Sequence, residues 1–386
     1  MSTAVRSHCK INLGLHIGPT RADGFHGLAT LSQTLALHDV VTVDVRKPTS
    51  QKRDVGHPAI SLTTNHPGVP TDSRNTAWKM VERALAWAGT SAVVSIHIQK
   101  ELPVQGGLGA GSANAAAALL GLERELGLTL SDPDRLRIAA EVGSDVPLFL
   151  VGGAVLGTSR GEVVSPMHDF PATPCVVAIP EIGVSTPRAF QEWDALCREQ
   201  GTGNREQRAD GRGSRKQNAF GLTSPVPADR LEELSHVYAS VLKVSPEGVS
   251  PTTEQASESS GILRDQATER KQGGSLEWNA PEPKSLNDLA GNPLVALVRT
   301  GIENDFEQVV FPQYPLLREI KHLLMGSSET GAIYAALSGS GSALFGLYRN
   351  EEDAKAAQQR VQASGCKALL TETLPRREYW RTMFAE

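Results

Sequence analysis

Residues 103–114 read Pro-Val-Gln-Gly-Gly-Leu-Gly-Ala-Gly-Ser-Ala-Asn, and four of the glycines, at 106, 107, 109 and 111, fall within six residues. An alanine- and leucine-rich stretch at 113–126 follows directly and predicts a helix. Glycines allow a backbone to approach an anion closely. The free N–H groups and the positive dipole end of a helix attract an anion to the same point. This stretch therefore predicts a phosphate-binding loop in front of a helix.

The loop differs from the two best-known phosphate loops. It lacks the Lys-Ser/Thr that closes a Walker A loop, and it does not have the G-x-G-x-x-G spacing of dinucleotide-binding proteins. Ser112 is placed to bind a phosphate oxygen or a Mg²⁺ ion. The alternative is an ordinary glycine-rich loop in which Ser112 only caps the helix, and the loop by itself leaves both interpretations open.

Strands and helices are predicted on both sides of the loop. Polar and apolar residues alternate at 9–17 and again up to Val45, and the Asp23-Gly24 turn between them predicts a pair of connected strands. A glycine pair at 152–153 precedes a further strand. The other predicted elements are helices over 73–88 and 134–142, a strand over 93–98, helices up to 298 and over 314–325, and strands over 333–337 and 343–348.

A segment from about 199 to 284 differs in composition from the rest. It is rich in Gly, Ser, Gln, Glu and Arg, and it holds few aromatic residues. Such a stretch buries too little apolar surface to offset the entropy lost on ordering. We predict a mobile insertion there, in which only 227–242 has helical periodicity.

Composition narrows the classes of protein that remain. The 386 residues carry 38 basic and 43 acidic side chains, a net charge of −5, which argues against binding to nucleic acid. No run approaches the ~18 apolar residues of a membrane helix, and the first ten residues resemble no secretory signal. The four cysteines form no C-x-x-C pair, so no zinc site or disulfide framework is predicted. A soluble protein of the cytoplasm is expected.

Two further stretches hold candidate chemistry. Asp145, in Gly143-Ser-Asp-Val-Pro147, could accept a hydroxyl proton, although an acidic residue of a turn or a helix cap has the same pattern. Ser338-Gly-Ser-Gly-Ser342 lies between two predicted strands and could wrap a ligand, or simply close a hairpin. Lys10, taken alone, could be a solvated lysine at the start of a strand.

Taken together, these stretches resemble a known family. Lys10-Ile-Asn-Leu, the glycine loop and Ser338-Gly-Ser-Gly-Ser are similar to the three motifs of the GHMP small-molecule kinases. More closely, the chain resembles the 4-diphosphocytidyl-2-C-methyl-D-erythritol kinase family over about residues 6–195 and 286–348. The stretches that carry this resemblance are Arg21-Ala-Asp-Gly-Phe-His26, Gly143-Ser-Asp-Val-Pro147, Val184-Ser-Thr186 with Phe190, and Asn304-Asp-Phe-Glu307 with Tyr314-Pro315.

The resemblance implies an α+β fold of two domains. The first, over 1–165, would be a ribosomal-S5-like domain that carries the ATP phosphate loop. The second, over 166–386, would be a ferredoxin-like domain that contains the insertion at about 199–284. The oligomeric state is not predicted.

The resemblance also implies a reaction, which is the ATP-dependent phosphorylation of the 2-hydroxyl of a cytidine-diphosphate-linked methylerythritol in non-mevalonate isoprenoid synthesis. ATP and Mg²⁺ would be the cofactors, with Ser112 as the one candidate metal ligand. Asp145 would take the hydroxyl proton, and Lys10 beside it would orient the hydroxyl. The residues implied for ATP binding are Pro103, Gly106, Gly107, Leu108, Gly109, Ala110, Gly111, Ser112, Ala113 and Asn114.

A cytidine pocket is implied as well. Phe25 and Phe190 would lie against the cytosine, and His26 would read its edge. Thr186, Asn12, Ser338 and Gly339 would complete the substrate site. The family usually has Tyr at position 25, Gly at 110 and Ser at 113, and these are Phe, Ala and Ala here.

Two alternatives follow from the same motifs. A GHMP kinase that acts on homoserine or mevalonate would not need the cytidine pocket. A catalytically silent nucleotide-binding regulator would be expected to lack Lys10 or Asp145, and both are present.

Overall fold

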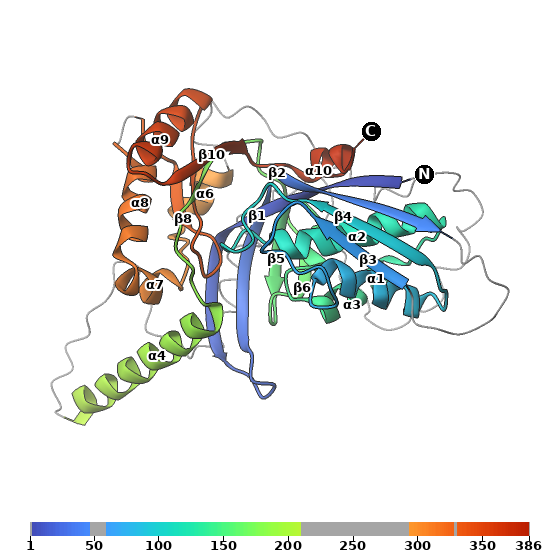
Figure 1. The fold of residues 1–386 in the computed structure, drawn as a ribbon. Coiled ribbons are helices and arrows are strands. Elements are labelled where there is room, and N and C mark those ends of the chain that lie inside the picture. Colours follow the sequence, from blue (N-terminus) through green and yellow to red (C-terminus); the bar gives the residue numbers. More distant parts are fainter. Residues whose placement is uncertain (1, 47–58, 210–292, 328–329, 386) are drawn as a thin grey trace, which may run out of the picture.

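A computed structural model of the chain describes residues 2–46, 59–209, 293–327 and 330–385. The described elements form two β-sheets with helices packed against them, as Figure 1 shows. One sheet has seven strands and the other has four. This mixture of sheets and helices confirms the expected α+β class.

The seven-stranded sheet is built around a long antiparallel pair, β1 and β2. Its order is β11-β1-β2-β4-β3, and β5 pairs with β2 while β6 pairs with β5. The parallel pair β3 and β4 is joined through a helix, as a parallel connection requires. The strands are β1 (Ser2–Thr20), β2 (His26–Arg46), β3 (Ala59–Thr64), β4 (Val93–Gln99), β5 (Ala154–Thr158), β6 (Val163–Pro166) and β11 (Phe384–Ala385).

The pairing of β1 with β2 is irregular where chemistry is expected. The register shifts between His8 and Lys10, and again between Asn12 and Gly14. A shift of this kind bends a strand and redirects its side chains. Lys10 and Asn12 therefore lie between two irregularities in an otherwise continuous strand.

Helices α1 (Thr76–Trp87) and α2 (Ala110–Leu126) lie on this sheet, and α3 (Asp132–Val142) packs against both of them. The alanines of α2 keep its side chains small, so the helix packs close to the strands beneath it. At Gly121 even a Cβ atom would come within 2.7 Å of the Val43 side chain. This close packing fixes the position of the start of α2.

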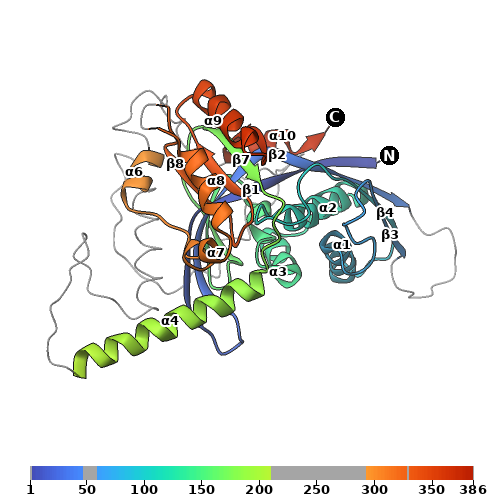
Figure 2. The same cartoon turned by 60° about the vertical axis from the view of Figure 1, so that its left-hand side comes forward.

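The four-stranded sheet forms the other half of the molecule. Its order is β10-β7-β9-β8, and all the pairs are antiparallel. Figure 2 shows the long helix α4 projecting from this half. The elements are β7 (Pro174–Ile179), β8 (Tyr334–Leu337), β9 (Leu344–Leu347), β10 (Lys367–Glu372), α4 (Thr186–Ala209), α6 (Pro293–Arg299), α7 (Glu307–Gln313), α8 (Pro315–Met325) and α9 (Glu351–Ala363).

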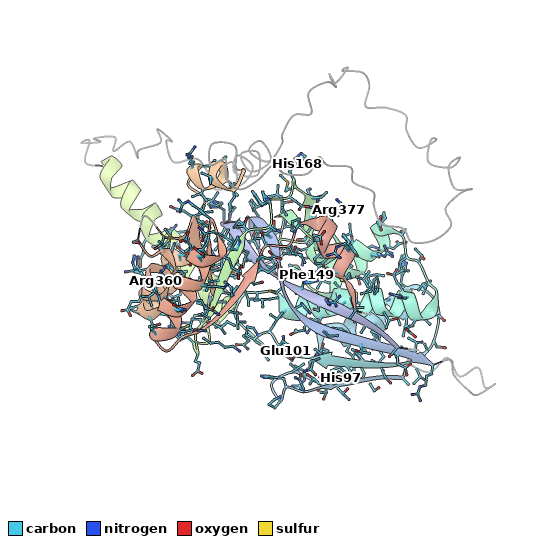
Figure 3. All side chains as sticks on the ribbon, turned by 90° about the horizontal axis from the view of Figure 1, so that it is seen from above. His97, Glu101, Phe149, His168, Arg360 and Arg377 are labelled. Carbon is cyan, nitrogen blue, oxygen red and sulfur yellow. The ribbon has the colours of Figure 1, made fainter. Side chains whose placement is uncertain are left out.

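The end of the chain returns to the first sheet. β11 pairs with β1, and helix α10 (Arg376–Thr382) packs into the same core as α2. The Tyr379 hydroxyl donates to the carbonyl oxygen of Phe149 at 2.6 Å. Figure 3 shows Phe149 in the same half of the molecule as His97, with Arg360 in the other half. The two halves are thus tied together by the last residues as well as by the chain near 166.

The predicted elements agree well with the observed ones near the glycine loop. The helix expected at 113–126 begins three residues earlier, at Ala110, because Gly109 in the left-handed region sets its start. Strand β3 lies where no element was predicted, and α4 continues to residue 209, within the stretch expected to be mobile. The rest of that stretch and the predicted helix at 227–242 lie outside the described residues. Among the described residues, no helix combines the length and the apolar character needed to cross a membrane.

Candidate active site

The glycine loop turns directly into α2, and two of its glycines cannot be replaced without a shift. Gly107 has φ +80°, and an added Cβ atom would lie 1.9 Å from the carbonyl oxygen of Ser338. Gly109 has φ +70°, and its Cβ atom would lie 2.8 Å from the ring of Phe149. Both positions therefore require glycine for conformation and for space.

The first turn of α2 is left open by its own chain. Its N-cap is Gly109, and no side chain of the described residues caps it. The side chains of Asn75, Ser131 and Asn350 cap α1, α3 and α9 by accepting a backbone N–H, whereas α7, α8 and α10, like α2, have no side-chain cap. The leading N–H groups of α2 thus remain available for an anion, which favours the predicted phosphate site.

The loop at 338–342 packs against the glycine loop. The Ser338 hydroxyl donates to the carbonyl oxygen of Gly107 at 3.0 Å, and the N–H of Ala343 donates to that of Gly106 at 3.1 Å. These two glycine-rich segments lie more than 200 residues apart in the sequence. The structure thus brings the glycine loop and the 338–342 loop into contact.

Lys10 joins the glycine loop to Asp145. Its ammonium donates to the carbonyl oxygen of Gly107 at 2.9 Å and to Oδ1 of Asn12 at 2.6 Å, and it lies 3.5 Å from Oδ2 of Asp145. The Lys10 side chain is only 3% exposed, whereas Asp145 is 45% exposed. A buried ammonium needs such partners to offset its lost hydration. Asp145, in turn, offers its carboxylate to solvent and to a ligand.

Asn12 is held by two hydroxyl-bearing residues of β2 that the sequence analysis did not single out. Its Nδ2 donates to the Thr30 hydroxyl at 2.8 Å and to the Ser32 hydroxyl at 3.3 Å. Asn12 pairs with Ser32 in the β1–β2 register. The alternation along the predicted second strand places Thr30 and Ser32 on one face and could have indicated them.

Several predicted ATP-binding side chains point away from the loop opening. Leu108, Ala110 and Ala113 are buried in the hydrophobic cores. Asn114 is also buried, and its Oδ1 accepts the hydroxyl hydrogen of Ser7 at 2.6 Å. These residues can contact a nucleotide only through their backbone. Gly111 is exposed and Ser112 and Pro103 are half-buried, so they remain open to a ligand.

The residues of the predicted cytidine pocket do not leave a gap for a base between aromatic rings. The rings of His26 and Phe190 are stacked on each other, with centroids 4.7 Å apart and planes 12° from parallel. A base does not fit between two rings at that separation. Phe25 is 52% exposed, and the guanidinium of Arg160 lies 5.0 Å from the centre of its ring. Thr186 contacts the 338–342 loop, since its hydroxyl lies 2.7 Å from that of Ser340.

Two residues that sequence reasoning did not assign to the site support it. Asn304 is buried, and its Nδ2 donates at 2.8 Å to the carbonyl oxygens of both Leu337 and Gly339, which shapes the 338–342 loop. Asp194 on α4 lies 2.9 Å from Nε2 of His26. Asn304 was part of a quoted motif, but nothing in the sequence indicates the contact of Asp194.

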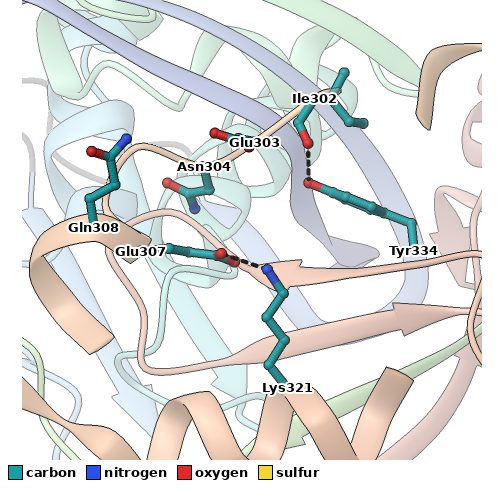
Figure 4. Close-up of a pocket in the computed structure, with 7 residues that line it drawn as sticks. All are labelled: Ile302, Glu303, Asn304, Glu307, Gln308, Lys321 and Tyr334. Atoms are coloured by element: carbon teal, nitrogen blue, oxygen red, sulfur yellow. Dashed lines mark hydrogen bonds and ion pairs between the residues drawn. The ribbon is translucent and has the colours of Figure 1, made fainter. Parts of the chain in front are cut away.

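A polar pocket lies next to Asn304 (Figure 4). It has a volume of about 270 Å³. Glu307 in its wall accepts the N–H of Leu337 at 2.9 Å and the ammonium of Lys321 at 2.6 Å. This pocket therefore adjoins the strand that leads into the 338–342 loop, and it does not include the Lys10–Asp145 pair.

Comparison with known proteins identifies the family. The GHMP kinases N terminal domain matches residues 75–153, and the GHMP kinases C terminal domain matches residues 291–367. A 4-diphosphocytidyl-2-C-methyl-D-erythritol kinase of a Synechococcus species is 30% identical over 384 residues, which cover 98% of this chain and 93% of that protein. A kinase of the same name from Caldicellulosiruptor saccharolyticus is 25% identical over 369 residues, covering 96% of each chain.

Solved structures support the fold alone. The crystal structure of a 4-(cytidine 5'-diphospho)-2C-methyl-D-erythritol kinase has a TM-score of 0.58 and 21% identity, and it covers 97% of this chain and 99% of its own. A homoserine kinase from Cytophaga hutchinsonii has the same TM-score at 17% identity, covering 97% of this chain and 95% of its own. The fold is therefore shared by proteins named as kinases of different substrates. The chain belongs to the 4-diphosphocytidyl-2-C-methyl-D-erythritol kinase family of the GHMP kinases, enzymes that use ATP.

Proposed function

We propose that this kinase transfers the terminal phosphoryl group of ATP to the 2-hydroxyl of 4-diphosphocytidyl-2-C-methyl-D-erythritol. One observation carries the proposal: Lys10 lies 3.5 Å from Asp145 and 2.9 Å from the glycine loop, so a base and a cation meet beside a phosphate site. The names of the full-length relatives give the substrate.

The start of α2 fits the ATP phosphates. Its uncapped N–H groups and positive dipole end supply the hydrogen bonds and the field that an anion needs. The glycines keep side chains out of the way, and the buried Leu108 and Ala110 fix the backbone from behind. Binding would thus depend on backbone groups, so Ala at positions 110 and 113 is compatible with it.

Magnesium fits this site as an ion bound mainly by phosphate. No cluster of three or more His, Cys, Asp or Glu side chains within the described residues could hold a metal ion. Mg²⁺ usually keeps one or two protein ligands and takes the rest from phosphates and water. Ser112, half-buried at the start of α2, is the side chain that could supply such a ligand. When bound, the ion neutralises charge on the transferring phosphoryl group.

Asp145 and Lys10 have separate roles in the transfer. Asp145 is exposed enough to meet the substrate, and it would accept the proton of the 2-hydroxyl. Lys10 is fixed by Asn12 and Gly107, so its charge stays beside the reacting oxygens. Phosphoryl transfer depends mostly on alignment and electrostatic stabilisation. A general base accelerates a reaction about 10²–10⁴-fold, and this is the rate enhancement expected from Asp145.

The remaining predicted residues would bind the substrate. Asn12, Ser338 and Gly339 line the junction of the two glycine-rich segments, where the methylerythritol would lie. Thr186, Phe25, His26 and Phe190 lie toward the β1–β2 turn and α4, where the cytidine would lie.

The test is an ATP-consumption assay with a panel of acceptors. The purified protein is incubated with ATP, Mg²⁺ and either the cytidine-diphosphate-linked methylerythritol, homoserine or mevalonate. We expect turnover with the first acceptor, and at least about a hundredfold lower kcat/KM with the other two. Preference for homoserine or mevalonate would overturn the substrate, and no turnover with any acceptor would favour a silent regulator.

A further inference from the structure

His26 is held by a single helix on two sides. Phe190 stacks on the face of its imidazole, and Asp194 contacts its edge, 2.9 Å from Nε2. Phe190 and Asp194 lie four residues apart on α4, so they project from the same side of the helix. His26 itself belongs to β2, at the far end of the β1–β2 pair. The contact therefore joins the two halves of the molecule.

The partner atoms determine which ring nitrogen carries hydrogen. An ionised carboxylate only accepts hydrogen bonds, so Nε2 of His26 must donate to Asp194. The Thr20 hydroxyl, at 3.3 Å, contacts the same nitrogen. A neutral imidazole with hydrogen on Nε2 has its lone pair on Nδ1. In a neutral His26, the contact with Asp194 therefore leaves Nδ1 as an acceptor.

Burial of the His26 ring holds it in this orientation. His26 is 8% exposed, and its ring plane is fixed by the stack on Phe190. A flip of the ring about χ2 would put a ring carbon in the place of Nε2 and lose the contact with Asp194. Asp194 is 42% exposed and contacts the buried ring from the solvent side.

We propose that Asp194 is a positioning residue that makes the enzyme select cytosine over uracil. This rests on the proposed function, in which His26 reads the edge of the base. The exocyclic amine of cytosine donates a hydrogen bond and matches an acceptor at Nδ1. Uracil has a carbonyl oxygen at the same place, so two lone pairs would face each other, which a buried site penalises.

The test measures kcat/KM for the cytidine-linked substrate and for its uridine-linked analogue, with ATP saturating. Asp194→Ala should lower the cytidine-to-uridine ratio of kcat/KM about tenfold, because either nitrogen of His26 can then carry the hydrogen. Asp194→Glu keeps an acceptor near Nε2 and should retain most of the ratio. Glu192→Ala is the matched control, since it removes an acidic residue from the same helix that pairs with Arg188 instead.

A spectroscopic measurement separates this role from a structural one. In protein labelled with ¹⁵N-histidine, and with His26 assigned through His26→Gln, wild type should show hydrogen on Nε2 and a bare Nδ1. Asp194→Ala should shift His26 toward a mixture of both forms. An unchanged substrate ratio in Asp194→Ala, or an Nδ1-protonated His26 in wild type, would overturn the proposal. A wild type that does not use the cytidine-linked substrate would instead overturn the proposed function.

Discussion

The two parts of the candidate site differ in how they are built. Around the glycine loop, polar groups are held by hydrogen bonds from distant segments, as when Gly107 accepts from both Lys10 and Ser338. The proposed base region, around His26, Phe190 and Phe25, is formed by side chains instead. There His26 and Phe190 cover each other's faces, while Phe25 is exposed. The proposed phosphate site is therefore already formed without a ligand, whereas we expect the proposed base site to be completed by the substrate.

This difference matches the two proposed ligands. Phosphate carries the same charge in every nucleotide, so a rigid set of backbone N–H groups recognises it without adjustment. A base presents one flat face and one patterned edge, and recognition requires an aromatic surface and an oriented edge group. The structure holds the edge group, His26, between Phe190 and Asp194. The aromatic surface of Phe25 remains in solvent.

The largest effect should come from Asp145→Asn. The amide keeps the shape of the side chain but cannot take a proton, so kcat should fall about 10²-fold or more. ATP affinity, measured by calorimetry with a non-hydrolysable analogue, should stay the same, because the phosphates bind to backbone groups. Loss of ATP affinity equal to the loss of kcat would contradict the separate roles.

Lys10→Ala should act on the same step as Asp145→Asn. The double variant should therefore lose much less than the product of the two single losses, as expected for residues that work as a unit. Fully multiplicative losses would show that the ammonium and the carboxylate, 3.5 Å apart here, act independently.

The next effect tests the rigidity of the phosphate site. Gly107→Ala places a Cβ atom 1.9 Å from the carbonyl oxygen of Ser338, so the two loops must separate. We expect ATP affinity to fall tens of fold and the free energy of unfolding to fall by about 1–3 kcal/mol. Gly127→Ala is the control, because it has a similar φ at the other end of α2 and open space around it. That variant should lose about 1 kcal/mol of stability and keep its ATP affinity.

A smaller effect, about tenfold in KM for the cytidine-linked substrate, is expected for Phe190→Ala. ATP affinity should not change. Since the face of Phe190 is covered by His26, we expect Phe190 to act through that ring, so the double variant with His26→Ala should be no worse than His26→Ala alone. Additive losses would show instead that Phe190 stacks on the base directly.

The smallest effect should follow replacement of residues 210–274 by a short Gly/Ser linker. Every candidate site residue lies outside this stretch, and closing a loop costs entropy that grows only with the logarithm of its length. The cut begins at 210 because α4 ends at Ala209. Activity should stay within severalfold of wild type. Loss of turnover or of soluble expression would give the segment a role that its composition does not indicate.

Local patterns predicted the structure of the glycine loop and of the helix behind it well. The glycines at 106–111 and the alanine-rich run behind them specify a loop and a helix from neighbouring residues alone, and both are observed. Lys10 and Asp145 were joined to this loop only through the resemblance to a family, since nothing local indicates that they meet.

Contacts between distant segments could not be predicted. His26 and Asp194 are 168 residues apart, and their contact depends on where α4 leaves the second sheet. Asn114 has the right place in the sequence for a ligand, but tertiary packing turns it toward Ser7. Periodicity determines which face of a helix is apolar, whereas the partner of each polar side chain is set by the packing of whole elements.

The most direct test is a crystal structure with a non-hydrolysable ATP analogue and the cytidine-linked substrate. We predict the terminal phosphate at the start of α2, the 2-hydroxyl within about 3 Å of an Asp145 carboxylate oxygen, and a glycine loop whose backbone is unchanged. Phe25 should lose most of its exposure by covering the base, with His26 still bonded to Asp194. A nucleotide bound elsewhere, a 2-hydroxyl remote from Asp145, or a reshaped glycine loop beside an unchanged Phe25 would contradict the account.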